Sequence, residues 1–216
     1  MAAIVITVAQ QKGGAGKTTL AANLATAWAA TRRVAALDMD PQRSLARWAA
    51  LRGDRGGVSV AECAGWRLPR ELDRLRQGHD LVLVDSPPQV DADARRAVRA
   101  AGLVLVPVQP SPPDIWAAEG TLRVAAEEKR PAALVLNRVP TAPRVRETAD
   151  RELRTRGLAP LTATLGNRAA YSHAFAEGLG VVEAAPRSAA AAELRALAAA
   201  IWAMIEAEAE AGRSRR

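Results

Sequence analysis

The chain has 216 residues, 49% of them hydrophobic, which suffices for one sizeable core and excludes an intrinsically disordered protein. Its single cysteine, Cys63, excludes an intramolecular disulfide and an all-cysteine metal site within one chain. The formal net charge of +7 comes almost wholly from arginine, and it points either to a polyanionic partner or to a composition bias without functional meaning.

Short apolar runs alternate with longer helical stretches along the chain. The runs 3–9, 33–38, 81–86, 103–108 and 132–137 are apolar on both faces, as buried parallel strands are. The helical stretches are 18–30, 41–51, 91–100, 113–128, 144–156 and a last one that begins near Arg187, after a less regular stretch over 157–186. This alternation predicts an α/β fold, in one domain over residues 1–216, with a doubly wound, mostly parallel sheet and helices on both faces. We expect no helix-turn-helix domain before it.

The first residues, "MAAIVITVAQ", lack the basic start of a signal peptide, and their apolar run is too short to span a bilayer. No later apolar run approaches the roughly 18 residues that a spanning helix needs. Together with the single cysteine, these features predict a cytoplasmic protein.

The stretch "QKGGAGKTT", residues 11–19, lies between the first predicted strand and the first predicted helix, and it holds two of the three lysines of the chain. Its three glycines allow the backbone to curl so that its N–H groups point at one centre, where the helix N-terminus adds a positive dipole. Lys17 would reach the β- and γ-phosphates of a nucleotide, and the Thr18 hydroxyl would complete the shell of a Mg²⁺ ion. The stretch therefore predicts a phosphate-binding loop and a P-loop NTPase.

Two further segments place carboxylates at the ends of predicted strands. "LDMDPQRS" carries Asp38 and Asp40 on the same side of an extended chain, and Pro41 suits the first turn of the next helix. "LVLVDSPPQ" carries Asp85 after four apolar residues, which is a Walker B pattern. A phosphate-bound Mg²⁺ needs such carboxylates, although an aspartate at a strand end can equally cap a helix or a turn.

The eight residues from Lys12 to Thr19 resemble, at every position, the deviant Walker A motif Lys-Gly-Gly-any-Gly-Lys-Thr-Thr of the ParA/MinD family of P-loop ATPases. The general P-loop pattern would place a glycine where this chain has Gln11. The two aspartate segments also resemble the family's Asp-any-Asp-Pro-Gln segment and its Walker B segment with two prolines. The resemblance implies an enzyme, a Mg²⁺-dependent ATP hydrolase that is slow without a partner, with ATP and Mg²⁺ as cofactors.

The same resemblance implies roles for individual residues. Lys12 would cross to the nucleotide of a partner subunit in an ATP-bound sandwich homodimer, and Asp40 would orient the attacking water. Asp38 and Asp85 would support Mg²⁺ through water ligands, together with Thr18. The expected catalytic residues are Lys12, Lys17 and Asp40, and the expected nucleotide contacts in the loop are Lys12, Gly13, Gly14, Ala15, Gly16, Lys17, Thr18 and Thr19.

Further polar groups follow the last predicted strand. Asn137 can donate to and accept from an adenine edge, and Arg138 can stack on a ring face, although asparagine is also an ordinary strand-end turn residue. The family places adenine-contacting residues in this region, which makes both residues candidate nucleotide contacts. The segment "VPVQPSPPDIWA" resembles the family's proline-rich segment beside the nucleotide and the dimer interface, where Asp114 is a candidate.

Residues 164–202 resemble the C-terminal part of the short, plasmid-type ParA proteins, in which arginines at positions like Arg168 and Arg187 help the ATP dimer bind DNA. Such contacts go to phosphates, carry no sequence preference and weaken with salt. The predicted helix before this region adds three arginines on a roughly shared face, for which a solvated charged surface is the alternative: Arg144, Arg151 and Arg154.

The resemblance thus implies an ATPase that cycles between an ATP dimer bound to non-specific double-stranded DNA of the nucleoid and a released form. A ParB-like or other cargo-adaptor protein would stimulate hydrolysis, and the cycle would segregate or position a plasmid, a chromosome region or a protein cargo.

The alternative function is a MinD-like membrane-cycling regulator, which needs a C-terminal amphipathic helix that lies on anionic lipid. The helical stripe of Leu194, Leu197, Ile201 and Ile205 is followed by Glu206, Glu208 and Glu210, which would oppose such lipid. We therefore interpret the stripe as core packing and expect no membrane partner. A third function, electron transfer through a cluster bridging two subunits, would need two cysteines in each chain, and this chain has only Cys63.

Overall fold

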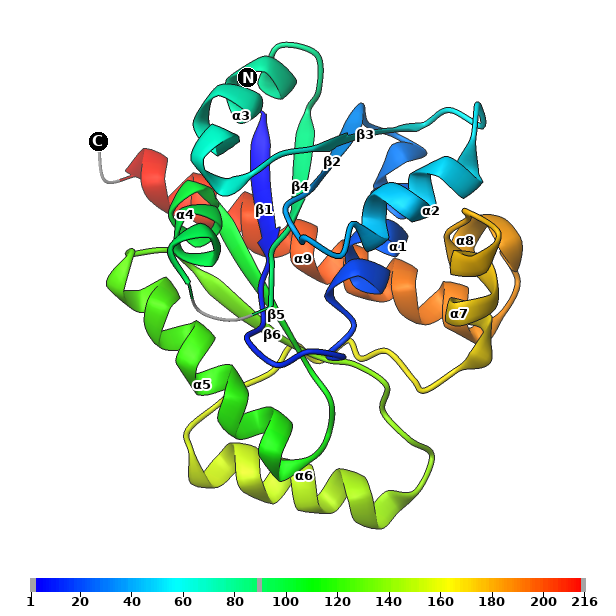
Figure 1. The fold of residues 1–216 in the computed structure, drawn as a ribbon. Coiled ribbons are helices and arrows are strands. Elements are labelled where there is room, and N and C mark those ends of the chain that lie inside the picture. The colour runs from blue at the N-terminus through cyan, green and yellow to red at the C-terminus, as the bar shows by residue number, and fades with distance from the viewer. Residues whose placement is uncertain (1–2, 89–90, 215–216) are drawn as a thin grey trace.

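The computed structural model describes residues 3–88 and 91–214. In this part of the chain a six-stranded sheet has the order β3-β2-β4-β1-β5-β6, and every pair of neighbouring strands is parallel (Figure 1). The strands are β1 (Ile4–Val8), β2 (Val34–Asp38), β3 (Val58–Glu62), β4 (Leu81–Asp85), β5 (Leu103–Val108) and β6 (Ala132–Leu136). The prediction of a doubly wound, mostly parallel sheet is confirmed, and the described sheet is parallel throughout.

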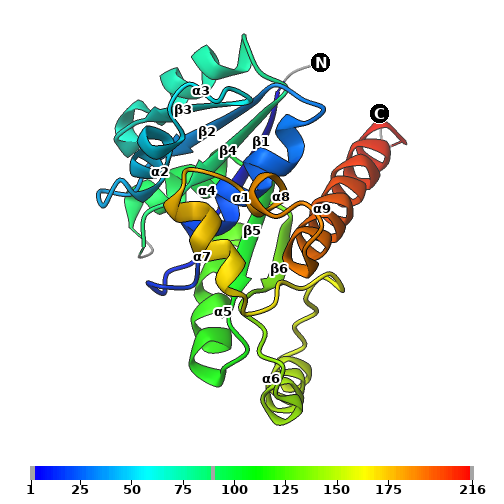
Figure 2. The same cartoon turned by 90° about the vertical axis from the view of Figure 1, so that its right-hand side faces the viewer.

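Helices cover both faces of this sheet. One face carries α1 (Lys17–Ala29), α2 (Ser44–Arg52), α7 (Ala169–Ala176), α8 (Val181–Ala184) and α9 (Ala189–Ser214), and Figure 2 looks onto it. The other face carries α3 (Leu68–Arg76), α4 (Ala92–Ala100), α5 (Pro112–Glu127) and α6 (Pro143–Thr155). A single 3-10 turn, Gly65–Arg67, precedes α3. The apolar core therefore lies in two layers, one on each side of the sheet.

Strand β3 and helix α3 were not expected from the sequence. Strand β3 lies at an edge of the sheet, pairs with β2 and is only half-buried, so it lacks the continuous apolar run that the four inner strands show. Helix α3 has an apolar stripe of Leu68, Leu72 and Leu75 that packs on the sheet between charged residues. Short amphipathic elements of this kind carry a weaker pattern than buried strands do.

The prediction that Pro41 opens a helix is wrong. Residues 40–43 form a turn in which the Arg43 N–H donates to the Asp40 carbonyl at 2.8 Å, and Arg43 has a positive φ of 55°. Helix α2 begins only at Ser44, so Asp40 lies in a loop above the sheet.

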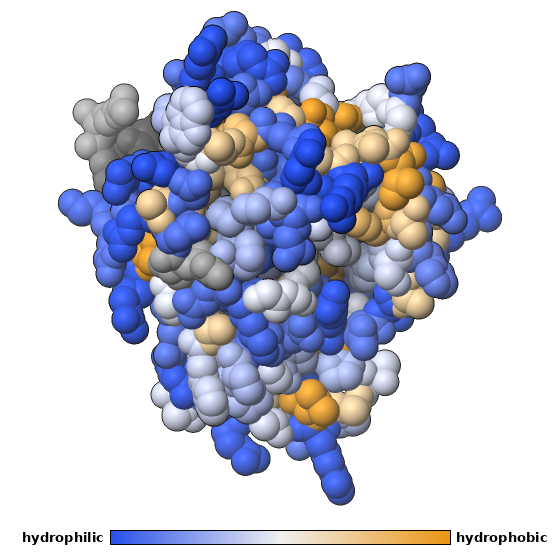
Figure 3. Space-filling model, in the orientation of Figure 1, coloured by the Kyte–Doolittle hydropathy of each residue, from blue (hydrophilic) through white to orange (hydrophobic). Residues whose placement is uncertain are grey.

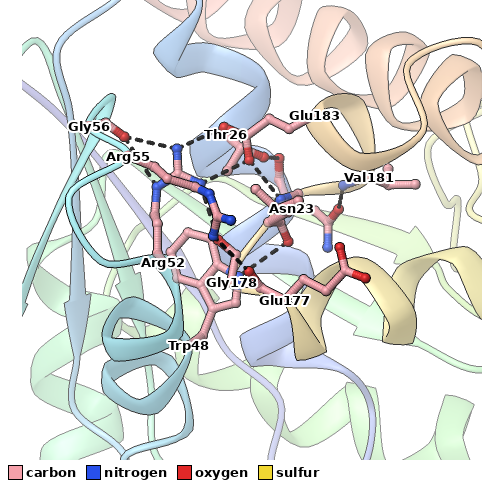
Figure 4. Close-up of polar contacts among 12 residues, drawn as sticks. Asn23, Thr26, Trp48, Arg52, Arg55, Gly56, Glu177, Gly178, Val181 and Glu183 are labelled. Carbon is pink, nitrogen blue, oxygen red and sulfur yellow. Dashed lines mark hydrogen bonds and ion pairs between the residues drawn. The ribbon is translucent and has the colours of Figure 1, made fainter.

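Arg52 ties α2 to α8 and to the loop between α7 and α8 (Figure 4). Its guanidinium, buried to 5% exposure, contacts Glu183 at 2.7 and 2.9 Å and the Gly178 carbonyl at 3.2 Å. Gly178 has a φ of +69°, and a Cβ there would lie 2.2 Å from the Arg52 backbone nitrogen, so only glycine fits. Removing Glu183 would leave this buried guanidinium without its counterion, which destabilises a fold.

The C-terminal helix α9 packs on the sheet. Leu194, Leu197 and Ile201 are fully buried there, which confirms that this stripe is core, and Ile205 is half-buried. Among the described residues, none of the helices is long and apolar enough to cross a membrane. The face drawn in Figure 3 is mostly hydrophilic, with apolar groups in small separate areas.

Candidate nucleotide-binding site

The glycine loop connects the C-terminal end of β1 to the first residue of α1, at the edge of the sheet where the strands end. Gly14 and Gly16 have φ values of +79° and +91°, which residues with a side chain rarely adopt. A Cβ on Gly16 would also lie 2.5 Å from the Asn137 amide nitrogen. Helix α1 has no side-chain cap at its N-terminus, so its first backbone N–H groups stay available to an anion.

Two side chains from neighbouring strand ends hold this loop. The Asn137 amide, after β6, donates to the Ala15 carbonyl at 2.9 Å, and the Gln109 amide, after β5, donates to the Gly14 carbonyl at 3.0 Å. The Arg138 guanidinium reaches the same Gly14 carbonyl at 3.3 Å. Asn137 also accepts the Arg138 backbone N–H, so its amide is engaged at both ends. The structure thus brings Asn137 and Arg138 to the loop, and their contact with adenine stays a prediction.

Lys17 lies buried at the start of α1, only 6% exposed. Burial lowers the pKa of its ammonium group, while the carboxylates of Asp85 and Asp40 raise it. The structure therefore brings Lys17, Asp85 and Asp40 together, as the sequence predicted. A buried ammonium that faces an open cleft is suited to bind a phosphate.

Asp85 is fully buried at the end of β4, and neither of its carboxylate oxygens has a hydrogen-bond partner among the residues described. Burial raises the pKa of the Asp85 carboxyl to about 7. The neighbouring Thr18 hydroxyl opposes this rise, although it does not meet the geometry of a hydrogen bond to Asp85. An unsatisfied buried carboxylate beside a threonine hydroxyl fits a cation, and Mg²⁺ commonly binds through one or two carboxylates plus substrate phosphates. Among the described residues, no group of three or more His, Cys, Asp or Glu side chains is arranged so that it could hold a metal ion.

Asp38 pairs with Asp85 across the strands β2 and β4. Its two carboxylate oxygens accept the backbone N–H groups of Asp40 and Ala46, each at 2.9 Å, so it caps α2 and holds the turn before it. Burial raises the pKa of Asp38, and these N–H groups lower it. The capping role left open by the sequence is thus observed, and a role toward Mg²⁺ stays a prediction.

Asp40 lies at the tip of that turn, half-buried, and accepts the Gln42 N–H at 2.9 Å. Its side chain lines an open cleft of about 280 Å³ together with the glycine loop, Thr18 and Thr19. A larger hollow of about 460 Å³ adjoins this cleft, because Thr19 and Arg138 line both. Gln42, the last residue of the Asp-any-Asp-Pro-Gln segment, also lines the cleft, as do Ser44 and Phe175, which no motif in the sequence singled out.

Lys12 points back into its own subunit. Its ammonium group contacts the Asp114 carboxylate at 2.6 Å, and the Ser111 hydroxyl donates to the same carboxylate. The Asp114 side chain is only 6% exposed, whereas that of Lys12 is 40% exposed. The side-chain amide of Gln11, the residue before Lys12, donates to the Ala117 carbonyl at 2.7 Å. The structure thus brings Asp114, a candidate from the proline-rich segment, into direct contact with the loop.

The predicted DNA contacts are separated. Arg168 lies in the wall of the larger hollow, where Glu193 binds it, whereas Arg187 is exposed in the link between α8 and α9. The three arginines predicted on a shared face are all exposed on α6, beside α5: Arg144, Arg151 and Arg154.

The fold and the loop together define the class of protein, a P-loop NTPase with a parallel sheet. A family model for the CobQ/CobB/MinD/ParA nucleotide binding domain matches residues 6–181, and the chain belongs to this family of P-loop ATPases. A relative in Halothiobacillus neapolitanus, maintenance of carboxysome distribution protein A, is 31% identical over 199 residues, covering 88% of this chain and 92% of that protein. The protein of the same name in Gloeobacter kilaueensis is 37% identical over 185 residues, covering 83% of this chain and 84% of that protein.

A solved structure supports the same fold. Cobyrinic acid a,c-diamide synthase from Mycobacterium smegmatis, with bound ADP and magnesium, superposes with a TM-score of 0.76 at 20% identity. The match covers 93% of this chain and 94% of that one.

Proposed function

We propose that this chain is a ParA-like ATP hydrolase that forms an ATP-bound dimer, binds DNA without sequence preference and positions a cargo. The observation that carries the proposal is the pair of lysines in one loop: Lys17 is buried beside Asp85 and Asp40, while Lys12 is held near the surface by Asp114. In this proposal Lys17 would bind the phosphates of its own subunit, and Lys12 would be released toward a second copy.

The residues of the cleft divide the work of hydrolysis. The first N–H groups of α1 and the Lys17 ammonium would bind the phosphates. Bound Mg²⁺ would neutralise phosphate charge, and Thr18 and Asp85 would hold it, with Asp38 alongside. Asp40, on the turn above the cleft, would orient the attacking water. In this proposal hydrolysis is slow until an adaptor protein stimulates it.

Lys12 completes the site of the second copy in this proposal. To do so its ammonium must exchange the Asp114 carboxylate for a phosphate of the other subunit. Lys12 is 40% exposed but Asp114 only 6%, so the exchange leaves a nearly buried carboxylate with the Ser111 hydroxyl as its remaining side-chain partner. The phosphate contact in the second copy has to offset that cost.

DNA binding would follow from the surface charge. The formal net charge is +7, and Arg187 is exposed with no ionic or hydrogen-bond partner among the residues described. Contacts from such arginines go to phosphates and place the protein on the nucleoid in the cytoplasm.

A protein assembly is the cargo that we favour, because the two relatives described above are named for carboxysome distribution. Plasmid or chromosome segregation is the other form of the same function. Both forms require an adaptor protein, ParB-like or otherwise, that links the cargo to the ATPase and stimulates hydrolysis. A MinD-like membrane cycle is less favoured, because the apolar stripe of α9 is buried in the core.

The test is binding to a random-sequence DNA duplex with ATP, with ADP and without nucleotide, over a series of salt concentrations. We expect binding only with ATP, a steep loss with salt, and stronger retention of DNA by Asp40→Ala, which would keep the ATP dimer without hydrolysing it. Arg187→Ala should weaken binding while the ATP dimer persists. DNA binding that ignores nucleotide, or ATP-dependent binding to anionic lipid vesicles instead, would overturn the DNA-based function.

A further inference from the structure

The larger hollow beside the phosphate cleft has the size of a small-molecule site, at about 460 Å³. It shares Thr19 and Arg138 with the cleft, so a nucleotide whose phosphates occupy the cleft has this hollow next to it. Leu20 and Leu165, both buried, give it an apolar floor. These features suit the planar, largely apolar ring of a purine.

Most amide and hydroxyl groups in this hollow are already engaged within the protein. Asn23 accepts the Val181 N–H at 2.8 Å and donates to a carbonyl of its own helix (Figure 4). Asn137 is engaged with the glycine loop, and the Tyr171 hydroxyl donates to the Ala190 carbonyl at 3.0 Å. Among the described lining residues, the side chains of Thr19 and Asn167 have no such hydrogen bond. A ring in this hollow would therefore meet few free polar groups and would be held mainly by the flat faces of its walls.

The Arg168 side chain lines this hollow, and its guanidinium is planar. Its Nε lies 3.0 and 3.1 Å from the two carboxylate oxygens of Glu193, and its Nη2 lies 2.6 Å from one of them. Glu193, near the start of α9, also accepts the Gly166 N–H at 3.0 Å. The planar group is thus fixed in the wall before any ligand arrives, which reduces the entropy that binding would cost.

We propose that Arg168 stacks on the purine ring of the bound nucleotide and that Glu193 is the positioning residue that holds it there. The inference rests on the proposed nucleotide site, and it gives Arg168 a role other than DNA binding. A guanidinium stacks on aromatic faces, which a lysine ammonium cannot do in the same way. Its charge is already balanced by Glu193, which makes it a poor counterion for DNA, whereas Arg187 is exposed and pairs with none of the described residues.

The experiment compares ATP with inorganic tripolyphosphate, which carries the phosphates without a base, by calorimetric binding in Mg²⁺. For Arg168→Ala we expect ATP affinity to fall about tenfold while tripolyphosphate affinity stays unchanged. Arg168→Lys, which keeps the charge, should lose nearly as much ATP affinity. Glu193→Gln should lose less, about threefold, again with tripolyphosphate unchanged.

DNA binding at saturating ATP is the second readout, with Arg187→Ala as the matched control. Arg168→Ala should bind DNA like the wild type, whereas Arg187→Ala should lose DNA binding and keep ATP affinity. Unchanged ATP affinity in both Arg168 variants overturns the inference, and loss of DNA binding alone returns Arg168 to the DNA surface. Equal losses for ATP and tripolyphosphate would mean that Arg168 only supports the fold.

Two controls keep these outcomes separate. Thermal unfolding identifies a variant that does not fold, and Arg168→Lys then decides the question because it preserves the volume and charge of the wall. A wild-type protein that binds neither ATP nor tripolyphosphate would overturn the proposed function and this inference with it.

Discussion

The two hollows of the proposed nucleotide site are built in opposite ways. In the phosphate cleft, Asp85 is buried with no hydrogen-bond partner among the described residues. Burial lowers the pKa of Lys17 and raises the pKa of Asp85, which favours the neutral form of each group. In the larger hollow, Arg168 and Glu193 bind each other, and Arg168 holds the pKa of Glu193 below its usual value. One hollow holds unsatisfied charges and the other holds a satisfied pair.

The difference indicates where a ligand acts on the fold. An unsatisfied buried charge destabilises the nucleotide-free protein, and such groups persist where a ligand supplies the missing partner. A satisfied pair fixes the shape of a wall and needs no ligand to do so. Nucleotide binding should therefore stabilise the protein mainly through the phosphate cleft.

Among the variants proposed, Lys17→Ala is expected to have the largest effect, and it acts on ATP binding in the phosphate cleft. Loss of the buried ammonium should weaken ATP binding by about 100-fold, because charge-assisted hydrogen bonds to phosphate disappear. The measurement is calorimetric titration with ATP and Mg²⁺. Lys129→Ala is the matched control, since Lys129 is the one lysine outside the loop and is exposed at the end of α5. Unchanged affinity in Lys17→Ala would mean that the cleft does not bind the phosphates.

Asp85→Asn should separate function from stability. We expect Mg²⁺-dependent ATP hydrolysis to fall at least tenfold, because the amide is a weaker ligand for the cation than the carboxylate. At pH 8, above the Asp85 pKa of about 7, the nucleotide-free variant should unfold at the same or a higher temperature than the wild type, since a buried charge has been removed. Asp73→Asn, at an exposed position on α3, controls for the change of charge. A marked loss of stability in Asp85→Asn would show that the carboxylate is satisfied within the fold.

The phosphate cleft was predictable from the sequence because its parts are local. Lys17 and Thr18 belong to one short stretch, and Asp40 and Asp85 each follow a buried run, so strand order brings them to one edge of a parallel sheet. The motif also located Lys12, but nothing in it indicated the contact with Asp114.

The larger hollow was not predictable, because its walls come from segments far apart in the chain. Gly166, Arg168 and Glu193 meet only through the packing of α9, and no spacing in the sequence encodes their contacts. The sequence also did not predict the edge strand β3, because its half-buried residues give no continuous apolar run. Long-range pairing of ordinary charged residues leaves no motif.

Asp114→Asn tests the link between the glycine loop and dimer formation, with a smaller expected effect. Removing the carboxylate charge should free Lys12, so that the ATP-dependent dimer forms about threefold to tenfold more tightly. Analytical ultracentrifugation with ATP measures this, and Lys12→Ala controls for the loss of the lysine itself. A weaker dimer in Asp114→Asn would indicate that Asp114 contacts the second copy instead of restraining Lys12.

Glu193→Gln has the smallest expected effect on stability and tests the satisfied pair through pH. Because Arg168 holds the folded-state pKa of Glu193 below the unfolded value of 4.5, the ion pair stabilises the fold above that pH and loses its effect as the pH falls further. The pair is partly exposed, so we expect a loss below about 1 kcal/mol in urea unfolding at pH 7. Wild type and variant should converge as the pH falls well below 4.5, whereas Glu147→Gln on the exposed surface of α6 should match the wild type throughout. A difference that persists at acid pH would mean that the Gly166 N–H, and not the charge of Arg168, accounts for the role of Glu193 in the wall.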